Sequence, residues 1–138
     1  MEFRSGLTVI TPAEVSSILV EGARQEIPVF VLATEGRVDR ESFFRAVRET
    51  LPLDPPLVSS RSWDALSDSL WEGVHKMASP HAVIVWCDAV FPDSESTGDD
   101  FQIALSVLQD VVESLADSCA ANGTPKVLSV YVAAASKA

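Results

Sequence analysis

His81-Ala82-Val83-Ile84-Val85-Trp86-Cys87 lies in the second half of the chain and is apolar from its second residue onward. A short run rich in β-branched residues favours a strand, and the lack of alternating polar residues indicates a strand buried on both faces. Similar runs occur at residues 28–33 and 127–133. We therefore expect about three buried core strands in one sheet.

Helical patterns fill the segments between these runs. Asp39, Ser62 and Thr97-Gly98-Asp99-Asp100 are placed to cap three helices, the last of which should end near Asn122-Gly123. Strands that alternate with helices predict an α/β fold, in which about three parallel strands are covered by helices. The apolar faces expected to meet the sheet are Phe43 or Phe44, Val47 and Leu51; then Trp63, Leu66 and Leu70; and then Phe101, Leu105, Leu108, Val112, Leu115 and Cys119.

Residues 1–27 carry one more pair of elements. Thr11-Pro12-Ala13-Glu14 is a capping box with proline at the first helical position, which predicts a helix from about residue 12 to residue 25. Leu7 to Ile10 can add an edge strand before it. No repeat, low-complexity tract or flexible linker divides the chain. We therefore expect one domain of all 138 residues, in which an N-terminal extension precedes a core at residues 28–133.

The charge of the chain limits its partners. The formal net charge is −10, and residues 54–138 hold 12 acidic against 4 basic side chains. Charge of this sign repels a phosphate backbone, so we expect a cationic protein rather than a nucleic acid as the partner. The N-terminus lacks a secretory signal pattern, and no apolar run reaches the roughly 18 residues that cross a bilayer. We therefore expect a cytoplasmic protein that does not enter a membrane.

One expected helix carries a pair of acids that folding does not explain. Asp64 and Asp68 are four residues apart and Trp71 is seven from Asp64, so all three share one helical face. Like charges at this spacing destabilise an isolated helix by roughly 0.2–0.5 kcal/mol. The helix dipole favours a carboxylate in the first turn, which accounts for Asp64 but not for Asp68. The face is either ordinary solvated surface or an acidic contact surface.

A second acidic face is expected on the long helix after residue 97. Asp110, Glu113 and Asp117 recur at helical spacing, away from the apolar stripe of that helix. A solvated surface again explains the pattern, and an extension of the acidic contact surface is the alternative.

The sequence offers little support for catalysis or metal binding. A small α/β hydrolase would use Asp64 and Asp68 as an acid–base pair, with His75 beside them, but the chain has no Gly-x-Ser-x-Gly nucleophile motif. His75 and His81 have no cysteine or carboxylate at a metal-ligand spacing. The segment from Asp93 begins like a calcium loop, but its twelfth place is Ala104 where a glutamate is required. We expect no cofactor, no metal ion and no enzymatic activity.

The run Trp63-Asp64-Ala65-Leu66-Ser67-Asp68-Ser69-Leu70, followed after a loop by Val83-Ile84-Val85-Trp86, resembles the barstar family of ribonuclease inhibitors. These inhibitors carry an Asp-Ala-Leu-x-Asp-x-Leu helix after a proline-containing loop, and then a Val/Leu-rich strand that ends in Trp. The resemblance extends from about Pro28 to Ala133, and the elements before it are similar to those of longer members of the family.

The resemblance implies a fold and a function. The implied fold is a parallel three-stranded sheet that presents an acidic helix and the preceding loop to the active site of a basic ribonuclease. Asp64 and Asp68 would then stand where substrate phosphates bind, and Asp110 would be a further contacting acid. The other contact residues implied on this helix and loop are Val58, Ser59, Ser60, Ser67 and Trp71.

The chain departs from the family pattern in the loop before the acidic helix. The family loop has the pattern Pro-x-aromatic-aromatic-Gly-x-Asn, whereas this chain has Pro56-Leu57-Val58-Ser59-Ser60-Arg61-Ser62. Ser67 also replaces a tryptophan, so aromatic anchoring falls to Trp71. The sequence therefore predicts an inhibitor that occludes a ribonuclease, and it leaves open an immunity or regulatory protein that binds a different toxin or partner.

Overall fold

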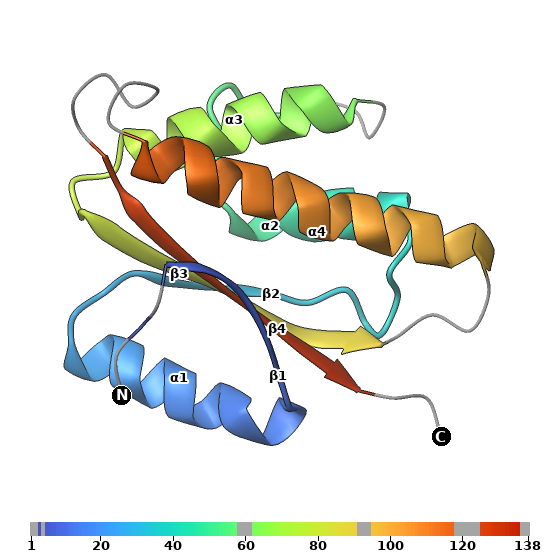
Figure 1. Cartoon of the computed structure of the whole chain (residues 1–138), viewed down its shortest axis with the longest axis horizontal. Coiled ribbons are helices and arrows are strands. Elements are labelled where there is room, and N and C mark those ends of the chain that lie inside the picture. The colour runs from blue at the N-terminus through green and yellow to red at the C-terminus, as the bar shows by residue number, and fades with distance from the viewer. Residues whose placement is uncertain (1–2, 4, 58–61, 91–94, 118–124, 136–138) are drawn as a thin grey trace.

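The computed structural model describes residues 3, 5–57, 62–90, 95–117 and 125–135. Its strands form one sheet in the order β1-β4-β3-β2, and every neighbouring pair is parallel. The predicted α/β fold is confirmed, and so is the edge strand near the N-terminus (Figure 1). The strands are β1 (Gly6–Ile10), β2 (Val29–Leu32), β3 (His81–Val90) and β4 (Val127–Ala135).

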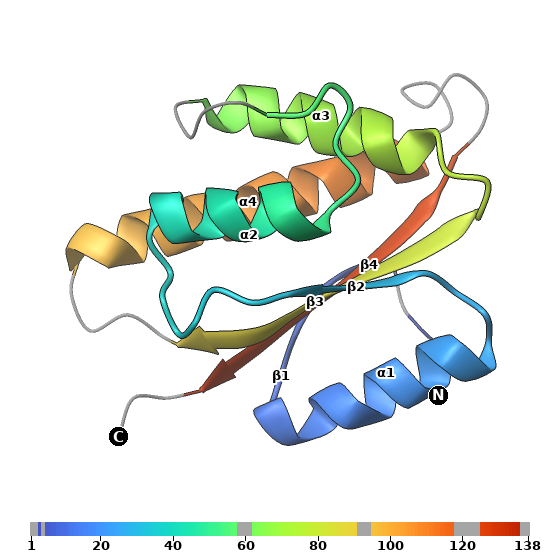
Figure 2. The same cartoon turned by 180° about the vertical axis from the view of Figure 1, so that it is seen from behind.

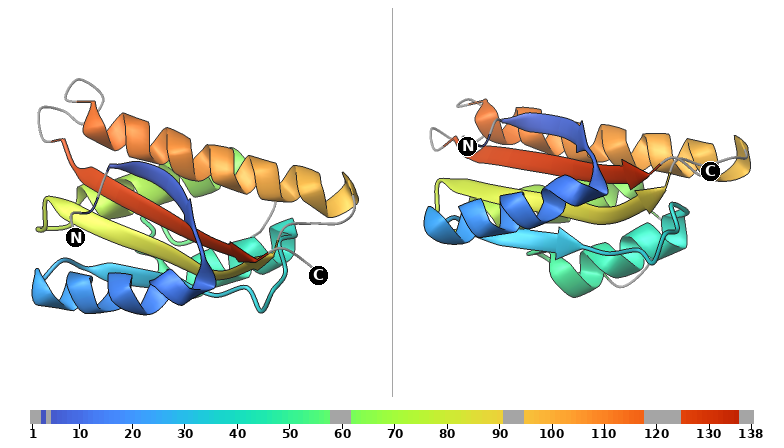
Figure 3. Two further views of the ribbon diagram at one scale, coloured as in Figure 1. Left: turned by 60° about the horizontal axis from the view of Figure 1, so that its bottom comes forward. Right: turned by 90° about the horizontal axis from the view of Figure 1, so that it is seen from below.

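The helices lie on both faces of this sheet. Figures 1 and 2 show α2, α3 and α4 together on one face, and α1 alone on the other. Seen from below, α1 crosses beneath the strands as the chain passes from β1 at one edge to β2 at the other (Figure 3). The helices are α1 (Val15–Arg24), which follows the 3₁₀ turn η1 (Pro12–Glu14), then α2 (Arg40–Thr50), α3 (Trp63–His75) and α4 (Glu95–Ala116).

The main core fills the space between the sheet and α2, α3 and α4. Trp86 on β3 lies at its centre, with ring centroids 5.1 Å from Phe43 and 5.5 Å from Phe101. Its indole Nε1 donates to the Thr34 hydroxyl at 3.1 Å, so the buried N–H of Trp86 is satisfied. The predicted inward faces are confirmed for the residues that the structure describes, except that Trp63 and Leu105 are only partly buried.

A smaller apolar cluster lies under the sheet. Ile18 of α1 packs there with Val83, Val85 and Tyr131. Phe3 covers one end, with its ring centroid 5.8 Å from that of His81. The His81 Nε2 lies 2.9 Å from the hydroxyl of Ser129, a fully buried residue of β4.

Three of the expectations about strands and helix ends were wrong. β2, an edge strand, is only partly buried instead of buried on both faces: Val31 is 37% exposed, because an apolar run does not show how completely each face of a strand is covered. The long helix begins at Glu95, before the segment expected to cap it, and Asp100 instead accepts the Arg40 N–H at the start of α2, at 3.0 Å.

The same helix also ends early, at Ala116. The Lys126 N–H donates to the Leu115 carbonyl at 2.8 Å, so the beginning of β4 takes a carbonyl that another helical turn would have used. Cys119 and the Asn122-Gly123 segment lie outside the described residues.

Candidate functional site

The acidic helix α3 is defined at its N-terminus by the predicted cap. The Ser62 hydroxyl accepts the Ala65 N–H at 3.1 Å. The buried side of α3 comprises Leu66, Ser69, Leu70, Gly73 and Val74. Asp64 and Asp68 consequently lie on the exposed side, as their spacing predicts, while Ser67, Trp71 and Glu72 are half-buried at its margin.

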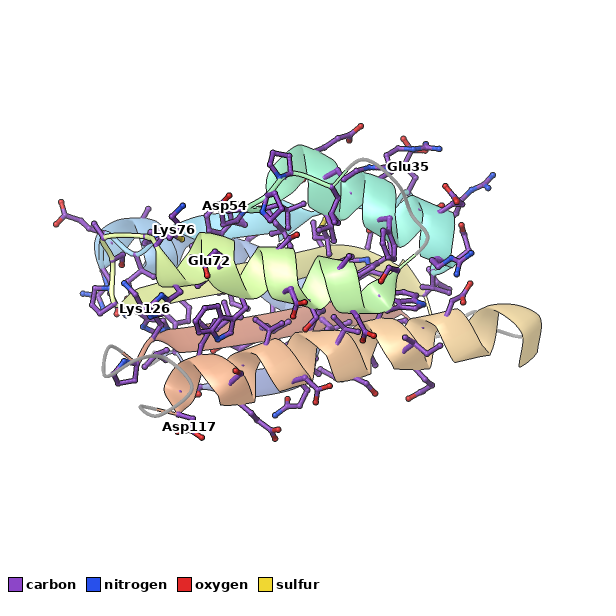
Figure 4. All side chains as sticks on the ribbon, turned by 90° about the horizontal axis from the view of Figure 1, so that it is seen from above. Glu35, Asp54, Glu72, Lys76, Asp117 and Lys126 are labelled. Atoms are coloured by element: carbon purple, nitrogen blue, oxygen red, sulfur yellow. The ribbon has the colours of Figure 1, made fainter. Side chains whose placement is uncertain are left out.

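The chain segment that precedes α3 packs against one side of that helix and is hydrogen-bonded to it. Gly73 lies so close to it that a Cβ at this position would be 1.8 Å from the Pro52 carbonyl oxygen. The Asp54 N–H donates to the Ser69 carbonyl at 3.0 Å, and the Lys76 ammonium pairs with the Asp54 carboxylate (Figure 4). The hydrogen bond to Asp54 raises the pKa of Lys76 above its usual range.

This fastening fixes where the loop toward Ser62 begins. The candidate contact residues Val58, Ser59 and Ser60 in that loop lie outside the described residues. Their contribution therefore stays a prediction from the sequence.

A hollow of about 340 Å³ lies between α3 and α4, which run side by side (Figure 4). It brings together four of the predicted site residues from two helices that are far apart in the sequence. Asp64 is not part of its lining and lies one helical turn closer to the N-terminus of α3. The lining residues are Ser67, Asp68, Trp71 and Glu72 from α3, and Asp110, Val111 and Ser114 from α4.

Glu72 is the site residue that the sequence prediction missed. It continues the four-residue spacing of Asp64 and Asp68 and lines the same hollow as Asp68 and Asp110. The signal was present in the spacing, but only the fold shows that Glu72 faces α4. Among the described residues, the lining of the hollow holds three carboxylates and no basic side chain. Such a surface is complementary to arginine or lysine.

Trp71 gives the hollow a rigid apolar wall. Its ring stacks on His75, with the centroids 4.6 Å apart and the planes 11° from parallel. Its indole Nε1 is buried and has no hydrogen-bond partner among the described residues. Because the stack already occupies one ring face and the N–H points away from solvent, the remaining exposed ring surface offers apolar contact to a partner.

The end of α3 is held by a buried cation. Lys126, at the beginning of β4, is 6% exposed, and its ammonium donates to the carbonyl oxygens of Met77 and Ser79. These hydrogen bonds tie the turn after α3 to the sheet. The C-terminal half of the acidic helix is therefore held in place, by the contacts of Pro52 and Asp54 along one side and by those of Lys126 with the turn that follows it.

No cluster of three or more potential metal-ligating side chains occurs in the described parts of the chain. Within those same residues, none of the helices has the length and apolarity needed to span a bilayer.

Comparison with known proteins gives one match. Residues 27–130 match the family model described as Barstar (barnase inhibitor). The match begins after α1, so β1 and α1 lie outside it. No curated protein and no solved structure matches the chain.

Proposed function

The chain belongs to the barstar family, and on that premise we propose that it inhibits a basic ribonuclease by covering the active site of the enzyme. The contact surface would be the exposed side of α3 together with the hollow that α3 shares with α4. The chain would have no catalytic role of its own.

The observation that supports this proposal best is the arrangement of carboxylates. Asp64 and Asp68 are exposed on one face of α3, and Glu72 and Asp110 extend the acidic surface across the hollow. A ribonuclease binds the phosphates of RNA with arginine, lysine and histidine side chains. Carboxylates held at fixed positions can pair with the same cations, and Asp64 and Asp68 would thereby replace two phosphates.

The fixed position of α3 supports the same proposal. Burying Asp64 and Asp68 in a complex costs free energy unless each carboxylate pairs with a charged donor. The two acids must therefore be held opposite the cations of the enzyme. Gly73 and the Lys76–Asp54 pair fasten one side of α3, and Lys126 fastens its C-terminal end. Preorganisation of this kind lowers the conformational entropy lost on binding.

The experiment uses barnase, the enzyme named in the description of the family. RNA cleavage is measured at several RNA concentrations with increasing amounts of the chain. We expect inhibition that is competitive with RNA, and we expect Asp68→Ala to require a higher inhibitor concentration. Inhibition that is independent of RNA concentration would show that the active site is not the surface covered.

The altered loop favours one second candidate function. The family's aromatic residues and glycine are missing between Pro56 and Ser62, and loop residues commonly determine the choice of partner. The same acidic surface would then neutralise a cationic toxin of different chemistry. Unchanged barnase activity, together with neutralisation of such a toxin that depends on Asp68, would favour this candidate over the first.

A further inference from the structure

We propose that the surface contacting the nuclease continues from α3 over α4 to β1, so that Leu7 and Val9 of the N-terminal extension form an apolar subsite for the same partner. This inference rests on the proposed function. It adds a contact from a strand outside residues 27–130, which are the residues matched by the family.

A second hollow lies on the other side of α4. It has a volume of about 390 Å³ and lies between α4 and β1, which Figure 3 shows along the same edge of the molecule. Asp110 lines both hollows, so the two depressions meet along the exposed ridge of α4. The lining residues of the second hollow are Leu7, Leu105, Ser106, Gln109, Asp110 and Glu113.

Two leucines and four polar residues line the second hollow. Leu7 and Leu105 are half-buried in it. Val9 is 53% exposed and lies on the same face of β1 as Leu7, because strand side chains alternate between faces. Ile103 is 39% exposed and lies on the same side of α4 as Ser106, three residues later. A single exposed aliphatic residue is ordinary, but Val9 and Ile103 lie on the two elements that border this hollow.

The charges at the rim indicate which occupant fits. Asp110 and Glu113 line the same hollow as Leu7 and Leu105, so that apolar and charged side chains adjoin there, as they do in many protein interfaces. A second copy of this chain would bring like carboxylates together across a symmetric contact, which is unfavourable. A cationic protein that already binds Asp68 and Asp110 meets no such repulsion. The occupant is therefore the nuclease itself, through an apolar patch beside its basic active site.

The test is the dissociation rate of the complex with barnase, measured by biolayer interferometry. The Val9→Ser/Ile103→Ser variant removes two exposed aliphatic side chains, so the fold should be retained, which a thermal melt verifies. We expect dissociation to be about tenfold faster with an almost unchanged association rate, because no charge is altered. Val20→Ser is the matched control, since Val20 is 68% exposed on α1, across the sheet.

Asp68→Ala, measured in parallel, separates this inference from the proposed function. If Asp68→Ala weakens the complex and Val9→Ser/Ile103→Ser dissociates like the unchanged chain, the acidic site stands and the subsite on β1 is wrong. If the unchanged chain does not bind barnase, both proposals are overturned. A chain that sediments as a dimer, and becomes monomeric in the Val9→Ser/Ile103→Ser variant, would assign the patch to self-association and overturn the inference.

Discussion

The two faces of the sheet are covered very differently. On one face, α2, α3 and α4 bury a continuous core around Trp86, and on the other, α1 covers the smaller cluster around Ile18. The candidate binding residues lie on the first face, in the part of the chain that the family model matches. The acidic helix therefore belongs to the layer with the most extensive packing. The α1 layer covers the sheet and leaves two of its own aliphatic side chains, Leu19 and Val20, exposed to solvent.

Removal of buried apolar volume should reveal this difference most strongly. Leu70 on α3 is fully buried in the larger core, whereas Ile18 on α1 packs in the smaller one. We expect Leu70→Ala to lower the free energy of unfolding by about 4 kcal/mol and Ile18→Ala by about 2 kcal/mol, because the thinner layer can relax around the cavity. Urea denaturation measures both, and equal losses would show that the two layers pack alike.

Two glycines give a second comparison of the faces. In Gly73→Ala the new methyl group would clash with the carbonyl oxygen of Pro52, a backbone atom that cannot easily move. We expect the free energy of unfolding to fall by about 3 kcal/mol. In Gly22→Ala the new methyl group would lie 2.3 Å from a side-chain methyl group of Val29, which can change rotamer. We expect the free energy of unfolding to fall by only about 1 kcal/mol.

The same urea experiment measures both glycine variants. Gly73→Ala should also weaken inhibition of barnase, since the segment before the acidic helix must move. Gly22→Ala serves as the control for that assay, because its contact lies on the other face. A Gly73→Ala variant as stable and as inhibitory as the unchanged chain would show that the segment is not fastened as described.

The smallest expected effect is a pH dependence of the folding stability, which comes from His81 on the α1 side of the sheet. Burial lowers the pKa of His81 below its ordinary value of 6.5. The unfolded chain therefore takes up a proton at a higher pH than the folded chain, and His81 favours folding above pH 6.5 and loses this contribution as the pH falls. We expect the melting temperature to drop between pH 7.5 and 5.5 by less in His81→Asn than in the unchanged chain. Identical pH profiles would show that His81 does not contribute.

The sequence predicted the features that depend on nearby residues. The caps at Asp39 and Ser62, and the exposed pair Asp64 and Asp68, each follow from spacings of a few residues. These patterns are sufficient to place the helices and one side of the candidate site.

The features that the sequence did not predict depend on contacts across the fold. Asp110 and Glu72 share a hollow although they belong to different helices, and Gly73 is needed because Pro52 passes beside it. The edge position of Val31 depends on the order of strands in the sheet, which an apolar run does not encode. Such contacts arise only once the helices pack on the sheet.

The most direct test of the central claim compares two variants with the same change in net charge. Asp64→Ala/Asp68→Ala removes the acids of α3, and Glu41→Ala/Glu49→Ala removes two exposed acids of α2. The Kd for barnase is measured for both at physiological salt. We predict that the first variant binds at least about 100-fold more weakly and that the second stays within about threefold of the unchanged chain. Equal affinities of the two variants would contradict the assignment of α3 as the contact surface.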